Sequence, residues 1–396
     1  MLAFIIAPFF IALLVLVFIR TIKHINTYKL PGLKVVEYLF GLLLFGGLCS
    51  IIIGFILPTN IVLKRVFTKI GYYWLGLILY LFVGLTIALL TRVIVWIFKR
   101  KQYNKKIARD ITTIFVIAFT IIMSIYGITN AHKLRVTNYE VSVNKESKLE
   151  ELNVVLIADL HLGYNVGIDE MQDMVEKINN QKPDVVVVAG DIFDNEYDAL
   201  ENPEILARVL SNINAKYGKY AIFGNHDIEE KILVGFTFDY SDEAKENASA
   251  DERMIKFISD SDFKLLYDSY ELIGDDIYIY GRPDAHKFNL GNKERKSPTS
   301  ITENLDKTKT IICLDHQPGE LTELANAGVD IDLSAHTHNG QIWPGTISIK
   351  WIWKNAYGLK QIGNMKSIVT SGVGLFGVNM RTGCYPEIVY IKINFK

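Results

Sequence analysis

Four long apolar segments lie within the first 130 residues, and they limit the folds open to this chain more than any other feature. Each is close to or above the roughly 20 residues with which an α-helix crosses a bilayer. The same region holds 14 Lys and Arg but only two acidic residues, which is atypical of helices buried in a soluble core. We therefore predict a transmembrane region of four helices over residues 1–130. The segments are Leu2–Ile19, Val35–Leu57, Tyr72–Phe98 and Ile111–Ile128.

Basic residues in the short loops predict how this region is oriented in the membrane. Loops 20–34 and 99–110 together hold ten Lys and Arg, whereas loop 58–71 holds three. Because positively charged short loops remain in the cytoplasm, we place the two richer loops there. Both chain ends and all residues after Ile128 are then extracytoplasmic. The first segment lacks the basic flank and small-residue cleavage site of a signal peptide, so we expect a retained helix.

Residues 131–396 differ in pattern and are predicted to form one α/β domain. Short apolar runs alternate with polar, helix-like stretches, which is typical of helices that cover a buried sheet. We interpret residues 129–150 as a polar join, and residues 239–252 and 284–306 as surface insertions. The covering helices are expected at 169–179 and 203–213, and the strands at 153–158, 185–189, 220–223, 277–280, 310–314, 329–333, 368–370 and 387–393.

Composition and charge exclude several classes of protein. Half of the chain is hydrophobic, which is too much for intrinsic disorder. Three cysteines are too few for a disulfide scaffold, and we expect Cys313 and Cys384 to be buried free thiols, although they could pair in an exported domain. Residues 131–396 carry 28 Lys and Arg against 41 Asp and Glu, so the basic excess lies beside the apolar segments. This distribution disfavours a nucleic-acid partner.

Polar clusters directly follow five of the strand-like runs. They contain five of the eight histidines. Ligand sites of α/β sheets lie beyond the carboxyl ends of the strands, so these clusters are the candidate functional residues. The clusters are Asp159-Leu160-His161, Gly190-Asp191-Ile192-Phe193-Asp194, Gly224-Asn225-His226-Asp227, Asp315-His316 and Ser334-Ala335-His336-Thr337-His338.

The residue types and spacings in these clusters favour metal binding. Side chains at positions i and i+2 of an extended chain face the same way. Asp159 and His161 can then reach one ion, and His336 and His338 can both point into the same site. Imidazole, carboxylate and amide ligands without cysteine suit Zn, Mn or Fe. Glycines at the start of two clusters let the backbone turn tightly close to the ions.

With the five clusters in this order, residues 150–396 resemble the calcineurin-like metallophosphoesterases. Within that family the chain is similar to the membrane-anchored bacterial branch, through His336-Thr-His-Asn-Gly-Gln-Ile and the late Pro386-Glu387-Ile388. The resemblance implies an α/β architecture in which a four-layer α-β-β-α sandwich follows the transmembrane helices. The chain departs from the family at Ala335, because the family usually has glycine before its His-x-His. A methyl group there concerns local geometry and leaves the ligands intact.

The resemblance also implies a centre of two divalent metal ions, Mn, Zn or Fe. Such ions, about 3.5–4 Å apart, clamp the attacking and leaving oxygens of an in-line displacement. His226 would contact the phosphoryl oxygens or protonate the leaving group, and Asp194 and Asp227 would orient neighbouring ligands. The ligands would be Asp159, His161 and His338 for the first ion, Asn225, His316 and His336 for the second, and Asp191 as the bridge.

We therefore predict a membrane-anchored enzyme that hydrolyses a phosphodiester, pyrophosphate or phosphomonoester bond of a lipid-linked or envelope substrate. The net charge of −13 over residues 131–396 repels dianionic monoesters more than diesters and mildly favours the latter. An extracytoplasmic nucleotide or cyclic-nucleotide phosphodiesterase is the alternative substrate class. A non-catalytic receptor or scaffold is the alternative outside catalysis. A transporter is disfavoured, because the spans lack paired acids and broken repeats.

Two further features allow two interpretations each. The aromatic stretch after His338 could be ordinary packing, or a lipid-facing or substrate-stacking surface near the membrane. It contains Trp343, Trp351, Trp353 and Tyr357. Arg381 lies in a glycine-rich stretch and could contact a substrate phosphate or pair with a surface acid. Arg282 is open to the same two interpretations.

Overall fold

The computed structural model describes residues 2–28, 31–58, 62–99, 104–230, 232–233, 236–237, 249–287, 290 and 294–396. The chain forms two compact units. One comprises Met1–Ile125 with Ile232–Phe238, and the other comprises Tyr126–Lys231 with Asp239–Lys396. Three basic residues of the predicted loops, most of the insertion 239–252 and part of the insertion 284–306 lie outside the described residues. The three basic residues are Lys29, Arg100 and Lys101.

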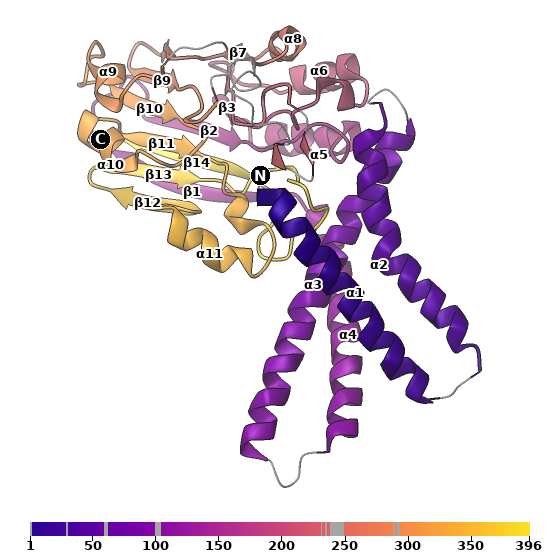
Figure 1. Cartoon of the computed structure of the whole chain (residues 1–396). Helices are drawn as coiled ribbons and strands as arrows, with labels where there is room; N and C mark the ends of the chain where they lie inside the picture. The colour runs from indigo at the N-terminus through magenta and orange to yellow at the C-terminus, as the bar shows by residue number, and fades with distance from the viewer. Residues whose placement is uncertain are drawn as a thin grey trace. The chain divides into compact units, whose positions relative to one another are not determined.

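Four long helices dominate the first unit (Figure 1): α1 (Leu2–Ile25), α2 (Leu33–Ile56), α3 (Val62–Phe98) and α4 (Lys105–Ala131). All four are long and apolar enough to cross a membrane, which confirms the prediction of four such helices. Helix α3 has 37 residues and begins before the predicted span. Lys64, Arg65 and Lys69 therefore lie in its first turns rather than in a loop, so the predicted loop 58–71 is too long.

The early start of α3 follows from close packing against α2. A Cβ added at Gly71 would lie 2.6 Å from Cγ1 of Ile51, and one added at Gly47 would lie 2.0 Å from the Trp74 ring. Small residues let two helix backbones approach closely, which is how membrane helices associate. The helical backbone therefore continues through this basic stretch.

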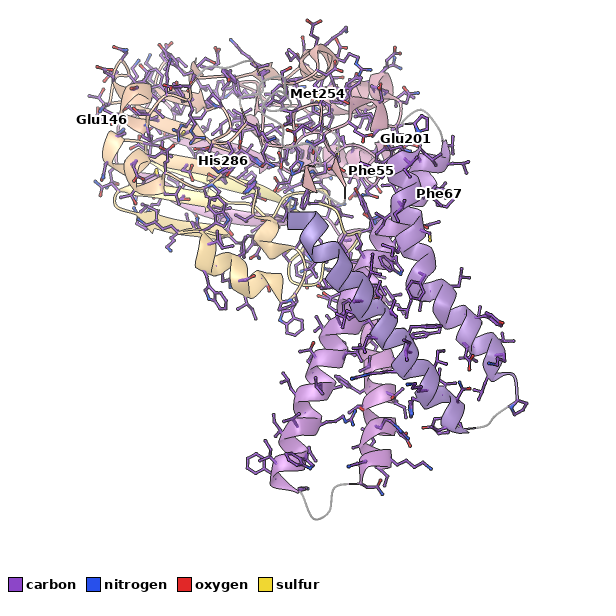
Figure 2. All side chains as sticks on the ribbon, viewed as in Figure 1. Phe55, Phe67, Glu146, Glu201, Met254 and His286 are labelled. Atoms are coloured by element: carbon purple, nitrogen blue, oxygen red, sulfur yellow. The ribbon has the colours of Figure 1, made fainter. Side chains whose placement is uncertain are left out.

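Most apolar side chains outside that contact are exposed. Leu42 is 69% exposed and Ile114 is 69% exposed, and Figure 2 shows the side chains along these helices. Such surface costs free energy in water and none in a hydrocarbon phase. The first unit therefore has the surface of a membrane-embedded region.

Two six-stranded sheets form the second unit. The first has the order β1 (Arg135–Val143), β14 (Glu387–Phe395), β2 (Glu151–Ile157), β3 (Val185–Ala189), β4 (Lys219–Ile222) and β7 (Lys264–Leu265). The second has the order β12 (Gly358–Ile362), β13 (Met365–Val369), β11 (Ile331–Ser334), β10 (Thr310–Leu314), β9 (Ile277–Gly281) and β8 (Ser269–Ile273). Strands β2, β3 and β4 are parallel, as are β9, β10, β11 and β13. A short pair, β5 (Ile232–Leu233) and β6 (Phe236–Thr237), belongs to the first unit.

Helices cover the outer face of each sheet and complete four layers. The first sheet packs under α5 (Ile168–Asn180), α6 (Pro203–Ser211) and α8 (Glu252–Asp260), with one apolar core between them. The second packs under α9 (Pro298–Thr302) and α10 (Leu321–Ala327). A third core joins the inner faces of the two sheets. The predicted α-β-β-α sandwich is therefore confirmed. Valine-rich β3 is buried on both faces, as expected for a parallel strand between two layers.

The predicted polar join 129–150 is wrong over much of its length. Helix α4 continues to Ala131, and β1 then pairs in parallel with β14 over nine residues. The stretch forms a strand because its side chains alternate between the two faces of the sheet. Val141 and Val143 point into the core between the sheets, while Ser142 between them is only half-buried. Cys313 and Cys384 are buried and free, as predicted.

Candidate metal centre

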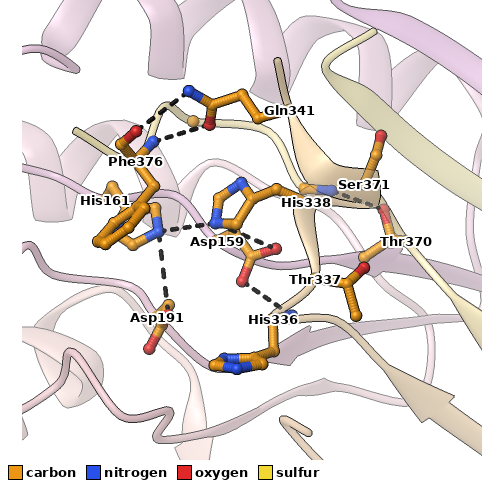
Figure 3. A network of polar contacts seen from close by, with 12 residues as sticks. Asp159, His161, Asp191, His336, Thr337, His338, Gln341, Thr370, Ser371 and Phe376 are labelled. Carbon is orange, nitrogen blue, oxygen red and sulfur yellow. Dashed lines mark hydrogen bonds and ion pairs between the residues drawn. The ribbon is translucent and has the colours of Figure 1, made fainter. Parts of the chain in front are cut away.

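The five predicted clusters meet where strands of both sheets end. Asp159 follows β2, Asp191 follows β3 and Asn225 follows β4 in the first sheet. His316 follows β10 and His336 follows β11 in the second sheet. The carboxyl ends of parallel strands lie at one edge of a sheet, so stacking the two sheets brings these residues together. Figure 3 shows part of the resulting network.

A first group of possible metal ligands consists of Asp159, His161 and His338. One ligand atom from each lies within 4.8 Å of the others, and all three residues are buried. The Nε2 atoms of His161 and His338 are 3.1 Å apart, and Nε2 of His338 is 3.8 Å from Oδ2 of Asp159. The three side chains therefore point at one small space.

A second group consists of Asp191, His316 and His336. Nε2 of His316 lies 3.1 Å from Oδ2 of Asp191 and 3.2 Å from Nδ1 of His336. Asn225 adds its amide oxygen at 3.1 Å from the same nitrogen. Nδ1 of His316 donates to the carbonyl of Ala189 at 2.8 Å, so that hydrogen bond fixes the ring and leaves Nε2 facing the group.

Asp191 connects the two groups. Its Oδ2 is 3.1 Å from Nε2 of His316 and 3.9 Å from Nε2 of His161. Its Oδ1 accepts a hydrogen bond from the backbone N–H of His226 at 2.8 Å, which holds the carboxylate in place. A single carboxylate therefore faces both candidate ion positions.

These residues fit a pair of divalent cations. Oδ2 of Asp159 is buried and has no hydrogen-bond partner among the described residues, and it faces the first group at 3.8 Å from Nε2 of His338. Two imidazole nitrogens 3.1 Å apart repel one another unless a proton or a cation lies with them. A set of nitrogen and oxygen ligands without thiolate suits Zn, Mn or Fe.

The pKa values of the histidines agree with a site built for positive charge. Burial, with the charge of His316, lowers the pKa of His336 to about 3. Burial and His161 also hold the pKa of His338 well below its ordinary value. Both rings are therefore neutral at pH 7 and keep a lone pair for a metal. Against the effect of burial, Asp191 raises the pKa of His316, so this carboxylate favours positive charge beside it.

The backbone at these residues is left-handed, and the expectation of an extended chain is wrong. Asp159, His161, His336 and His338 have φ of 51°, 45°, 67° and 47°. A non-glycine residue in this conformation costs free energy, and residues strained in this way cluster at functional sites. His336 and His338 nevertheless both point into the same centre, each toward one of its two ligand groups, and Asp159 and His161 share one group as predicted. The two groups match the ligand sets that the family resemblance implied.

Two predicted glycines make the close approach between loops possible. A Cβ at Gly190, which has φ of 84°, would lie 2.7 Å from the Gly224 nitrogen and from Nδ1 of His316. A Cβ at Gly224 would lie 2.3 Å from Oδ1 of Asp191. No larger residue fits at either position without moving a candidate ligand. Ala335, in contrast, is buried without loss of its hydrogen bond, as its N–H donates to the carbonyl of His316 at 2.9 Å.

The candidate catalytic residue His226 lies beside both groups. Its ring centroid is 5.2 Å from that of His161 and 4.9 Å from that of Phe376. Its Nδ1 is hydrogen-bonded to the side chain of Asn195, and burial lowers its pKa. Asn195 was not predicted, although it directly follows the Gly190–Asp194 cluster and is buried. Bonding at Nδ1 leaves Nε2 as the nitrogen that can meet a substrate.

Asp194 and Asp227 support the site in different ways. Oδ1 of Asp194 lies 3.6 Å from Nδ1 of His161, so it can orient that ring. Asp227 accepts backbone N–H groups of Ile192, Phe193 and Gly224 at 2.6–2.8 Å. Burial and Asp191 raise the pKa of Asp227 to about 7. Asp227 therefore joins the loops after β3 and β4 through these backbone hydrogen bonds.

Phe376 is a second residue that sequence reasoning missed. Its ring lies 5.6 Å from that of His161 and 6.1 Å from that of His338. The Gln341 side chain holds the backbone of this loop, accepting from the Phe376 N–H at 3.0 Å and donating to its carbonyl at 3.1 Å (Figure 3). The glycine-rich stretch around it was noticed, but nothing local distinguishes this phenylalanine from a core residue.

Neither interpretation of Arg381 is correct. The residue is fully buried, and its guanidinium donates to the carbonyls of Ser371 at 2.8 Å and Gly374 at 2.7 Å. It lies 3.5 Å from Nδ1 of His338, so it braces the loop behind a candidate ligand. Arg282 is also fully buried, and it pairs at 2.8 Å both with buried Asp315 and with the partly exposed Glu320. It therefore forms the predicted ion pair with an acid at the surface, in addition to a buried one.

Comparison with known proteins agrees with this geometry. Residues 152–340 match the sequence profile of the calcineurin-like phosphoesterases. A metallophosphoesterase of Aquifex aeolicus is 28% identical over 278 residues, which cover 70% of this chain and 98% of that protein. One of Campylobacter jejuni is 27% identical over 80% of this chain and 76% of its own length. A transmembrane protein with a metallophosphoesterase domain from Danio rerio is 28% identical over 71% of this chain and 62% of its own length. Residues 152–340 of this membrane protein therefore carry a calcineurin-like phosphoesterase domain.

Proposed function

We propose that the chain is a membrane-anchored phosphoesterase that works with two divalent metal ions. The observation that carries this proposal is the position of Asp191, whose Oδ2 lies within 4 Å of a histidine from each ligand group. A bridged pair of cation sites with a histidine beside it is an arrangement suited to phosphoryl transfer.

Each ion would have its own ligands and one in common. Bound there, the ions would supply Lewis-acid stabilisation of the phosphoryl oxygens and an activated water near neutral pH. Asp159, His161 and His338 would hold the first ion, and Asn225, His316 and His336 the second. Asp191 would contact both.

The chain's own residues would act on the rest of the phosphoryl group. His226 would donate from Nε2 to a phosphoryl oxygen or to the leaving oxygen, in an orientation set by the Asn195 contact at Nδ1. Phe376 packs against the rings of His161, His226 and His338 and would exclude water from that side. Asp194 would orient His161, and Asp227 would keep the two loops in register.

We further propose that the substrate is a phosphodiester or pyrophosphate of a lipid-linked or envelope compound. Two observations support this: the domain is acidic, with 28 Lys and Arg against 41 Asp and Glu over residues 131–396, and it is joined to candidate membrane spans. The charge of loops 20–34 and 99–110 supports an extracytoplasmic domain.

Reconstitution with metal tests the activity. We would purify the full chain in detergent, remove its metals, and assay bis-p-nitrophenyl phosphate and p-nitrophenyl phosphate after adding Mn, Zn or Fe. Metal-restored cleavage of the diester, lost in an Asn225→Ala/His226→Ala variant, is the expected result. Cleavage of the monoester alone would change the substrate class to phosphomonoesters. Failure to bind two metal ions per chain, with no cleavage of either ester, would overturn the proposal.

A further inference from the structure

Helix α11 (Gly345–Ile352) of the second unit carries a group of exposed apolar side chains. Ile347 is 48% exposed, Trp351 is 81% exposed and Ile352 is 70% exposed. We call these three residues the α11 patch. No residue of this helix is buried, so the patch contributes little to the domain's core, and the interpretation of this aromatic stretch as ordinary packing is wrong for Trp351.

The patch and the residues around it form an apolar surface flanked by lysines. Ile347 and Trp351 are four positions apart, so they lie on the same face of the helix. Lys350 and Lys354 are exposed beside them. Tryptophan and branched apolar side chains next to lysines are typical of helices that lie in the headgroup region of a bilayer.

Hydrogen bonds within the second unit attach α11 to the end of a candidate membrane span. The last turns of α4 belong to this unit, and the Gly127 carbonyl there accepts from the Arg381 N–H at 3.0 Å. The side chain of Asn130 donates to the Arg381 carbonyl at 3.0 Å. The adjacent Thr382 accepts from the N–H of Trp343 at 3.0 Å. Since Trp343 lies two residues before α11, that helix begins close to the last turns of α4, which is a candidate membrane span.

The other end of α11 leads to the metal centre. The Trp353 ring lies 5.5 Å from that of His336 in an edge-to-face contact. The hydroxyl of Thr337 donates to the carbonyl of Ala356 at 2.6 Å. A short segment therefore connects an exposed apolar surface with a candidate metal ligand.

We propose that the α11 patch inserts into the interface of the lipid bilayer and places the metal centre at headgroup level. The attachment of α11 to the end of α4 leaves the bilayer as the nearest apolar phase, and the lysines complement anionic headgroups. It follows that phosphate groups of membrane lipids are the substrate class within reach. That last statement rests on the proposed function, whereas the docking of α11 does not.

Spin labels in the full chain test the docking directly. We would replace Trp351 with Cys in a Cys49→Ser background, attach a nitroxide, and reconstitute the protein in vesicles of phosphatidylcholine and phosphatidylglycerol. Ile205→Cys, on α6 and also exposed, is the matched control. We expect the label at 351 to collide more with oxygen, which concentrates in lipid, and less with a water-soluble nickel chelate than the label at 205.

Two outcomes would overturn the docking. Equal access of the nickel chelate to both labels would place α11 in water. Shielding of label 351 from both reagents would mean that a protein surface, such as a second copy of this chain, covers the patch.

An activity measurement tests the consequence for substrates. An Ile347→Ser/Ile352→Ser variant should lose about tenfold in kcat/KM on a phosphodiester carried by a vesicle lipid, because its interfacial anchoring is weakened. It should retain the unchanged chain's rate on soluble bis-p-nitrophenyl phosphate. Equal losses on both esters would contradict a role of the patch in reaching lipid. Absence of hydrolysis in the unchanged chain would remove the proposed function and leave the spin-label result standing.

Discussion

His226 shows how one side chain can be tested apart from the metal ligands around it. It belongs to neither ligand group, yet its ring lies 5.2 Å from that of His161. We expect His226→Ala to lower kcat by about 100-fold or more, the cost of losing one donor to a transition-state oxygen. Elemental analysis should find two ions per chain, as in the unchanged protein. Asn225→Ala is the contrasting variant, because it should lose metal; an H226A protein that also loses metal would contradict the assigned role.

Asp332 on β11 makes stability depend on pH in an unusual direction. It is fully buried, and accepts the hydroxyls of Ser334 and Ser367. Burial and the charge of Asp315 raise its pKa from 3.8 to about 7. Between these values the folded chain holds a proton that the unfolded chain has released. The contribution of Asp332 to the unfolding free energy therefore falls as pH rises from about 4 to about 7.

Asp332→Asn should remove that dependence, since its amide accepts the same hydroxyls without a charge to bury. The stability of the variant relative to the unchanged chain should increase by on the order of 3 kcal/mol across this pH range. Unfolding of both metal-free proteins in detergent at about pH 4 and at about pH 7, the two ends of this range, measures the difference. Parallel pH profiles would show that Asp332 is ionised in the folded state.

At the level of elements, the loops after β3 and β4 lie in contact because both contain glycine. A Cβ at position 224 would lie 2.3 Å from Oδ1 of Asp191. We expect Gly224→Ala to cost about 1–3 kcal/mol of stability, as overpacking typically does, and to weaken metal binding through Asp191. Gly319→Ala is the matched control, since its Cβ would meet no atom closer than 4.0 Å. Equal metal affinity in both variants would refute this account of the loop contact.

The strands could be predicted from sequence to different degrees. β3 and β10 have the predicted bounds, because strands buried on both faces are continuous apolar runs. The sequence predicts a polar join where β1 lies, because apolar and polar residues alternate only weakly in this stretch. That pattern does not indicate a strand until the partner β14 is known. The place of β1 in the sheet depends on pairing with residues about 250 positions later.

For the whole molecule, the orientation in the membrane is the main prediction still to be tested. In a Cys49→Ser background, we would introduce Lys182→Cys in the domain and Thr27→Cys in the loop after α1. A membrane-impermeant maleimide should label position 182 in intact cells and position 27 only after lysis, because the loops richer in Lys and Arg stay in the cytoplasm. Cys313 and Cys384 are buried and should not react. The reverse labelling pattern would place the domain in the cytoplasm.

The sequence by itself determined the features that are written locally in the chain. Four apolar runs specified the membrane helices, and five polar clusters after apolar strands specified the family and the candidate ligands. Tertiary structure decided which ligands belong together. After β11 the backbone is left-handed, and His336 and His338 face different ligand groups of the centre. Asn195, Phe376 and Arg381 acquire their positions only through contacts with distant segments. Local patterns record which faces are apolar, whereas the side chains that meet at a site are fixed by how sheets and loops pack.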